Sequence, residues 1–195
     1  MQTAHIARYD EPPAPAWEVG RPQRAFYDLE MAGQIGREVL DVGCGAGEHA
    51  LFFAAHGHVA AGVDPATSAI VKAQARARER RLPVPFVVAE LLELGRIGRS
   101  FDCAVDAGTF HRIERAARAD YAASLASVVK PGGQLFLLCF GDHEHGHGGP
   151  ERVSQAELRA AFAAGWRIDA IDDSRIESHI YPGGANAWLL QATRR

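Results

Sequence analysis

The ten residues LDVGCGAGEH, at positions 40–49, place three glycines between an apolar run and an expected helix start. Gly45-x-Gly47-x-x-Ala50 satisfies the G-x-G-x-x-G/A form of the dinucleotide-binding fingerprint, while Gly43-x-Gly45-x-Gly47 satisfies a second pattern. Glycines in such a turn allow the backbone to approach a ligand closely. The stretch therefore predicts a cofactor site between a strand and a helix, and its glycines leave two cofactor types open.

Short apolar runs with β-branched residues alternate with helix-like segments outward from this stretch. Such alternation is typical of a doubly wound, mostly parallel α/β sheet, which binds ligands at the carboxyl ends of its strands. The capping box Ser154-x-x-Glu157 opens a late helix, and the runs at 166–171 and 187–192 are spaced for a terminal antiparallel pair, which makes seven expected strands. The first five strands are expected at EVLDVG (38–43), VAAGVD (59–64), VPFVVAE (84–90), FDCAVDAG (101–108) and QLFLLCFGD (134–142), and the helices at 22–33, 47–57, 65–82, 116–130 and 155–165.

Length and composition indicate a single domain over residues 1–195, with an N-terminal arm and lid-like helix at 1–33 and a core at 34–195. The formal net charge of −3 argues against nucleic acid as a partner. No long apolar segment and no secretory leader are apparent, so we expect a cytoplasmic protein without a membrane partner, as a monomer or homodimer. The cysteines have no C-x-x-C spacing and are expected to be reduced thiols: Cys44, Cys103 and Cys139.

Two aspartates bear on the choice of cofactor. Asp64 ends the expected strand 59–64, where its carboxylate can accept two hydrogen bonds from a ribose diol, as any adenosine cofactor requires. Asp41 lies two residues before the first glycine and adds negative charge close to where a pyrophosphate would lie. Asp41 therefore favours a cationic ligand over a dinucleotide.

At these residues the chain resembles the class I S-adenosylmethionine-dependent methyltransferases, which have a Rossmann-like fold. Asp41-x-Gly43-x-Gly45-x-Gly47 matches the family's acidic-x-Gly-x-Gly-x-Gly motif, Asp64 matches its acidic residue after the second strand, and Glu90 matches its adenine-contacting polar residue, where Asp is more usual. Lys130-Pro131-Gly132-Gly133 is similar to a frequent turn of the family, and the resemblance runs from about residue 17 to the end. It implies S-adenosylmethionine as cofactor and S-adenosylhomocysteine as product. The implied cofactor site consists of Trp17, Asp41, Gly43, Cys44, Gly45, Gly47, Asp64, Pro65, Glu90, Leu91 and Asp106.

The end of the fourth expected strand, DAGTFHRI (106–113), lacks the (D/N)PP(Y/F) tetrapeptide of methyltransferases that act on nucleic-acid bases. It resembles the same segment of small-molecule methyltransferases of the thiopurine, thiol and halide group, and WEVGRPQ (17–23) resembles that group's lid. The resemblance implies methyl transfer to an O, N or S atom of a small, (hetero)aromatic molecule. His111 and Asp106 are the catalytic candidates, His111 as a base or a polar contact. The expected acceptor-side residues are Phe110, His111 and His143.

Alternatives remain open for several of these residues. His111 can equally cap a helix, and Asp106 can simply end its strand. His143, His145 and His147 alternate in a glycine-rich segment, for which we favour a loop over the site, or an uninvolved loop, over a metal centre. An NAD-dependent oxidoreductase and a non-catalytic adenosine-cofactor-binding protein are the competing functions.

Overall fold

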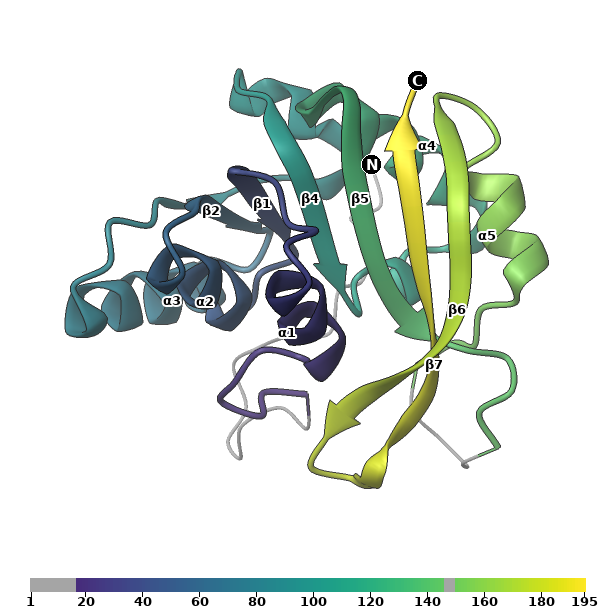
Figure 1. The fold of residues 1–195 in the computed structure, drawn as a ribbon, viewed down its shortest axis with the longest axis horizontal. Helices are drawn as coiled ribbons and strands as arrows, with labels where there is room; N and C mark the ends of the chain where they lie inside the picture. The colour runs from purple at the N-terminus through teal and green to yellow at the C-terminus, as the bar shows by residue number, and fades with distance from the viewer. Residues whose placement is uncertain (1–16, 146–149) are drawn as a thin grey trace.

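The computed structural model describes residues 17–145 and 150–195, and in this part of the chain seven strands form one sheet in the order β3-β2-β1-β4-β5-β7-β6 (Figure 1). Strands β1 to β5 are parallel, and β7 runs antiparallel to both β5 and β6. The strands are β1 (Glu38–Val42), β2 (Val59–Asp64), β3 (Phe86–Val88), β4 (Phe101–Ala107), β5 (Val129–Phe140), β6 (Trp166–Ser178) and β7 (Tyr181–Arg194). The helices are α1 (Arg24–Met31), α2 (Glu48–Ala55), α3 (Thr67–Arg80), α4 (Arg118–Val128) and α5 (Gln155–Ala161), with short 3₁₀ turns η1 (Leu91–Ile97), η2 (Phe110–Arg112) and η3 (Arg115–Ala117).

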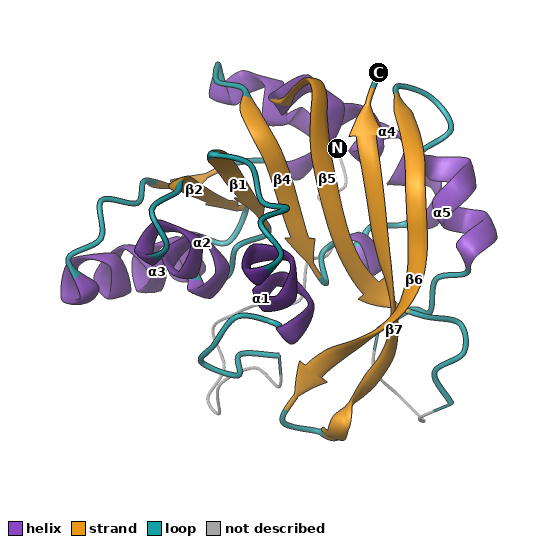
Figure 2. Ribbon diagram, in the orientation of Figure 1, coloured by secondary structure: helices purple, strands orange, loops and turns teal. Residues whose placement is uncertain are grey.

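Helices cover both faces of the sheet, which explains why its central strands are apolar throughout (Figure 2). Successive residues of a strand point to opposite faces, so Phe136 packs with α1, α2 and α3 while Leu137 packs with α4 and α5. Both side chains are fully buried. The two faces therefore form two separate apolar cores on one sheet.

The order of the strands reverses next to β1. The chain passes from β1 to β2 and β3 on one side and then returns to β4 and β5 on the other. A crevice forms at the carboxyl ends of the strands at such a switch point, and this is where open α/β sheets bind ligands. The glycine turn that follows β1 lies at this point.

The expected fold class is confirmed, with the antiparallel pair at the end of the chain and the capping box of Ser154 and Glu157 at the start of α5. Strands β6 and β7 are longer than the expected runs 166–171 and 187–192, because their hairpin stays paired as far as Ser178 and Tyr181. Figure 1 shows this hairpin extending past the tip of β5. The division into an arm at 1–33 and a core at 34–195 stays a prediction, and residues 1–16 lie outside the described part.

Candidate cofactor and acceptor site

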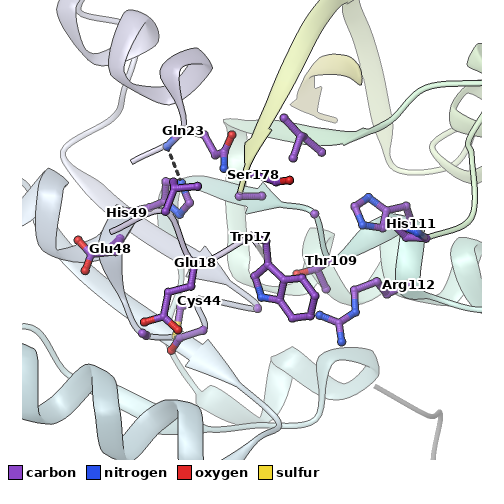
Figure 3. A pocket seen from close by; sticks show the side chains of 18 of the residues that line it. Trp17, Glu18, Gln23, Cys44, Glu48, His49, Thr109, His111, Arg112 and Ser178 are labelled. Carbon is purple, nitrogen blue, oxygen red and sulfur yellow. Dashed lines mark hydrogen bonds between the residues drawn. The ribbon is translucent and has the colours of Figure 1, made fainter. Parts of the chain in front are cut away.

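A cavity of about 500 Å³ lies at the carboxyl ends of β1, β2 and β4 (Figure 3). Its floor is the glycine turn at 43–46 with the first residues of α2, and the segment 107–112 after β4 forms one wall. The arm at 17–23 and the tip of the β6–β7 hairpin complete the enclosure. This volume falls within the range of about 300–1,000 Å³ that is usual for small-molecule sites.

The glycine turn requires glycine for two physical reasons. Gly43 has a φ of +68°, and a Cβ placed on it would lie 1.9 Å from Oγ1 of Thr109. Gly47 has a φ of +85°, and a Cβ on it would lie 2.6 Å from the ring of Phe86. A side chain at either position would strain the backbone; at Gly43 it would displace Thr109 of the cavity wall, and at Gly47 it would displace Phe86 of the core. Gly43 and Gly45 line the cavity, whereas Gly47 supports the turn from behind as it leads into α2.

Asp64 is held by the backbone at the edge of the cavity. Its Oδ2 accepts a hydrogen bond from the N–H of Gly45 at 2.9 Å, and its Oδ1 accepts one from the N–H of Ala66 at 2.8 Å. Each carboxylate oxygen keeps further lone-pair capacity for a ligand hydroxyl. Burial raises the pKa of Asp64, and the two N–H donors and the charge of Arg112 act in the opposite direction. The side chain is thus oriented to accept a pair of hydroxyl groups.

Asp41 lies behind the glycine turn and does not line the cavity. Its side chain is 1% exposed, and its Oδ2 accepts the N–H of Ala50 at 3.2 Å. Burial, and to a smaller extent the neighbouring Asp64 and Asp106 carboxylates, raise the pKa of Asp41 to about 8, against the opposing effect of the hydrogen bond from Ala50. A positive ligand favours the ionised form of carboxyl groups gathered at the ends of neighbouring strands and a pyrophosphate opposes it, so this set fits a sulfonium and an ammonium better than a pyrophosphate.

Asp106 lies behind the cavity wall, and its expected contact with the cofactor stays a prediction. The residue is fully buried and does not line the cavity. Its carboxylate accepts hydrogen bonds from the N–H of Thr109 at 2.7 Å, the N–H of Phe110 at 3.1 Å and the hydroxyl of Tyr121 at 2.9 Å. Asp106 therefore shapes the turn that presents residues 107–112 to the cavity.

Phe110 also differs from its expected place on the acceptor side. Its ring is fully buried in the core, 6.2 Å from the ring of Tyr121 and 5.6 Å from that of Phe162, and does not line the cavity. The 3₁₀ turn η2 causes this, because it turns the side chain of Phe110 inward and leaves that of His111 on the cavity wall.

His111 is the sequence-predicted acceptor-side residue that the structure does place on the cavity. Its Nδ1 is 3.2 Å from the backbone N–H of Phe140, and the two rings meet edge to face at a centroid distance of 5.0 Å. Burial, with a smaller contribution from the cations Arg112, Arg118 and Arg152, lowers the pKa of His111 to about 3. The imidazole is therefore neutral at physiological pH.

Of the histidine-rich segment, the described residues His143 and His145 do not line the cavity, whereas Pro150 and Glu151, which follow it, do. The ring of His143 is 4.2 Å from that of Trp188 on β7, and its Nε2 is 3.3 Å from Asp173 on β6. His145 is exposed, and His147 falls outside the described residues. Within residues 17–145 and 150–195, no group of three His, Cys, Asp or Glu residues is arranged to hold a metal ion.

The remaining expected cofactor residues divide into two groups. Trp17 and Cys44 line the cavity. Pro65, Glu90 and Leu91 do not, and Leu91 is buried in the core. Glu90 is exposed after β3, whose end lies beside Asp64 through the hydrogen bond from the N–H of Ala89 to the Asp64 carbonyl.

Hydrogen bonds hold the arm at the cavity, and they involve residues that the sequence analysis did not single out. The amide of Gln23 accepts the N–H of Glu177 at 2.7 Å and donates to the Glu177 carbonyl at 3.1 Å, as a backbone neighbour would. The backbone N–H of Gln23 donates to Nε2 of His49 at 3.1 Å (Figure 3). Because Gln23 and Glu177 are 154 positions apart, no local pattern signals this pairing.

Charged side chains hold the outer end of the arm. Arg76 bridges Glu18 of the arm and Glu48 at the start of α2, and Arg80 also binds Glu48, at 2.9 Å. The guanidinium of Arg112 lies 5.0 Å from the ring centroid of Trp17. The four-residue spacing of Arg76 and Arg80 places both on one helix face, which was the available signal for this contact.

A family model and a sequence relative that match this chain are both described as methyltransferases. The model of the methyltransferase domain family matches residues 39–133. The 2-heptyl-1-hydroxyquinolin-4(1H)-one methyltransferase of Mycobacteroides abscessus is 32% identical, over 92% of this chain and 89% of that protein. A structure solved in work on the conversion of a disulfide bond into a thioacetal group during echinomycin biosynthesis is also 32% identical, with a TM-score of 0.84 over 92% of this chain and 84% of that one.

A more distant structure supports the fold. The magnesium protoporphyrin IX methyltransferase of Synechocystis PCC 6803, solved with bound S-adenosylmethionine, is 20% identical with a TM-score of 0.68, over 88% of this chain and 76% of that one. In the described residues, no helix is long and apolar enough to cross a membrane. The chain belongs to the S-adenosylmethionine-dependent methyltransferases, which use S-adenosylmethionine as cofactor.

Proposed function

We propose that this enzyme methylates an O, N or S atom of a small heteroaromatic molecule, with a ring hydroxyl as the first acceptor to test. The observation that carries this proposal is a single cavity in which Asp64 lies on the floor while His111, Phe140 and Tyr181 line the same space. The Mycobacteroides abscessus relative acts on a hydroxyquinolinone, which is an acceptor of this class.

The cofactor half of the cavity is proposed to be its floor. Asp64 accepts the ribose hydroxyls, and the glycine turn at 43–45 allows close approach of the methionine part. A bound sulfonium would favour the ionised form of Asp41, which lies behind the turn without direct contact. When bound, S-adenosylmethionine supplies an electrophilic methyl: an acceptor lone pair forms the new bond to carbon, and the carbon–sulfur bond breaks with its electron pair going to sulfur.

The acceptor half is proposed to lie between the segment after β4 and the β6–β7 hairpin. Phe140 and Tyr181 meet edge to face here, with ring centroids 5.7 Å apart. Ile176 and Ile180 of the hairpin line the same cavity. Apolar and aromatic walls of this kind bind a flat ring and exclude water, which favours displacement at carbon by proximity and alignment.

The arm is proposed to act as a lid over both halves. Trp17 lines the cavity while remaining 44% exposed, so it borders both the ligand space and the solvent. Its contact with Arg112 connects the arm to the segment that carries His111. We further propose a cytoplasmic monomer or homodimer that acts on a free small molecule and binds no nucleic acid or membrane.

The test is a panel of acceptors incubated with methyl-labelled S-adenosylmethionine: hydroxyquinolines, heteroaryl thiols, N-heterocycles and, as a contrast, aliphatic alcohols and amines. We expect turnover within the heteroaromatic group, loss of turnover in Asp64→Ala, and normal turnover in the control Asp172→Asn, whose carboxylate binds Gln191 on the exposed sheet. Turnover of the aliphatic acceptors alone would contradict the proposal.

A further inference from the structure

The hydrogen bond between Phe140 and His111 determines which ring nitrogen carries the proton. A backbone N–H can only donate, so Nδ1 of His111 must present its lone pair to Phe140. In a neutral imidazole the proton then resides on Nε2. Phe140 is the last residue of β5 and pairs with Ala187 of β7, which fixes the direction of its N–H.

The protonated ring is disfavoured for a second, geometric reason. An imidazolium would carry a proton on Nδ1 as well, and that proton would face the N–H of Phe140. Three cations act on the ring from the elements around it: Arg112 in η2, Arg118 in α4 and Arg152 in the segment before α5. A general base at this position needs a free Nε2 lone pair, which requires breaking the contact with Phe140.

The Nε2 side of the ring is available to a ligand. Among the residues that the structure describes, Phe140 is the one hydrogen-bond partner recorded for the His111 side chain, and the residue lines the cavity. Gly108, with a φ of +90°, lies next to this side of the ring, and a Cβ there would come within 3.2 Å of Cε1 and 3.7 Å of Nε2. Figure 3 shows the imidazole beside Arg112, across the cavity from His49.

We propose that His111 donates a hydrogen bond from Nε2 to the methyl acceptor and does not remove a proton from it, so that the enzyme selects heteroaromatic acceptors that arrive as anions. Ring oxyanions, including N-oxide anions of N-hydroxy heterocycles, and heteroaryl thiolates belong to this class. An anionic acceptor and a sulfonium give two neutral products, and no proton passes to the protein. This inference rests on the proposed function, and it names the protonation state of the substrate.

Nitrogen-15 NMR of the full chain tests the tautomer without any acceptor or cofactor. The protein contains nine histidines, and the spectrum of His111→Gln assigns the resonances of His111 by their disappearance. We expect the pattern of a neutral ring protonated on Nε2, unchanged from about pH 5.5 to about pH 8. A proton on Nδ1, or a titration within that range, would overturn the inference.

A matched pair of variants separates the two roles in turnover. In His111→Asn the side-chain oxygen can still accept the N–H of Phe140 but no donor reaches the Nε2 position, whereas in His111→Gln a donor reaches it. We expect kcat/KM of His111→Gln to be at least about tenfold higher than that of His111→Asn. The reason is that loss of a hydrogen bond to a charged acceptor costs more than loss of one between neutral groups. Equal losses in both variants would overturn the donor role, provided that unfolding temperatures show both variants to be folded.

The pH dependence of kcat/KM with two acceptors of the same shape and different acidity completes the test. We expect the midpoint to follow the acidity of each acceptor, in the wild type and in His111→Gln alike. A common midpoint for both acceptors that disappears in His111→Gln would identify His111 as a base and overturn the inference. Absence of turnover for every heteroaromatic anion would instead contradict the proposed function, and the NMR result would still decide the tautomer.

Discussion

Replacing Asp41 with Asn is expected to stabilise the ligand-free protein and to weaken its binding of S-adenosylmethionine. The carboxyl group of Asp41 is 1% exposed and accepts a hydrogen bond from the N–H of Ala50. Asn has the same shape, and its side-chain oxygen can accept the same hydrogen bond. The substitution therefore removes a buried ionisable group without leaving the Ala50 N–H unpaired.

The size of the effect follows from the pKa shift. Burial raises the pKa of Asp41 from 3.8 to about 8, so the folded state binds more protons than the unfolded state between these values. Stability then falls as the pH rises through this window, by about 1.4 kcal/mol per pH unit. A pH of 7 lies roughly 3 units above the unfolded-state pKa of 3.8. The substitution can therefore raise the free energy of unfolding by at most about 4 kcal/mol. Such a gain corresponds to an increase in unfolding temperature of up to about 16 °C in a chain of this size.

Thermal unfolding followed by circular dichroism at pH 6, 7 and 8 measures this difference. We expect Asp41→Asn to unfold at a higher temperature than the wild type, with a margin that grows from pH 6 to pH 8. The buried histidines are present in both proteins, so their effect on the pH dependence of the unfolding temperature largely cancels in the difference between the two. Asp102→Asn is the matched control, because Lys130 and the N–H of Glu38 lower the pKa of Asp102 and its effect should be constant over this range.

The ligand side of the prediction has the opposite sign. Titration calorimetry at pH 8 should show weaker binding of S-adenosylmethionine to Asp41→Asn, because a charge that attracts the cationic ligand has been removed. A margin in unfolding temperature that stays constant or shrinks with increasing pH would refute the assignment of a raised pKa to Asp41. Unchanged affinity would show that its charge does not act on the ligand.

Three further substitutions test the walls of the cavity. Asp64→Ala should weaken binding of S-adenosylhomocysteine by about 10- to 100-fold in calorimetry, since the lost carboxylate leaves ribose hydroxyls and two N–H groups unpaired, and unchanged affinity would place the ribose elsewhere. Gly43→Ala should lower the unfolding temperature and abolish binding, because its Cβ would lie 1.9 Å from Oγ1 of Thr109; a folded variant that binds normally would contradict this. Trp17→Ala should mainly speed release of the cofactor in stopped-flow measurements, and an unaltered release rate would show that the arm is no lid.

Local patterns carried enough information to predict the fold and several of the residues that line the cavity. Strand–helix alternation and the glycine turn depend on neighbouring residues, so the parallel sheet and the position of Asp64 followed from them. The capping box of Ser154 and Glu157 was confirmed for the same reason. Hairpin β6–β7 was underestimated because its outer half has mixed polarity, with few fully buried side chains to mark it as a strand.

The acceptor half depends on contacts that are distant in the sequence. Phe110 and His111 are adjacent, and only the three-residue turn η2 decides which of them faces the cavity. The carboxylate of Asp106 accepts a hydrogen bond from Tyr121, 15 positions away, and the residue does not line the cavity. The arm is held by Gln23 through the backbone of Glu177, 154 positions along the chain. Patterns of neighbouring residues cannot signal such pairings.

A crystal structure of the enzyme with S-adenosylhomocysteine and a hydroxyquinolinone tests most directly whether one cavity holds cofactor and acceptor side by side. We expect both ribose hydroxyls to lie within about 3 Å of the Asp64 carboxylate, and the heterocycle to lie against Phe140 with its oxygen at hydrogen-bond distance from Nε2 of His111. A ribose bound away from Asp64, or a heterocycle bound outside the space between His111 and the β6–β7 hairpin, would contradict the assignment.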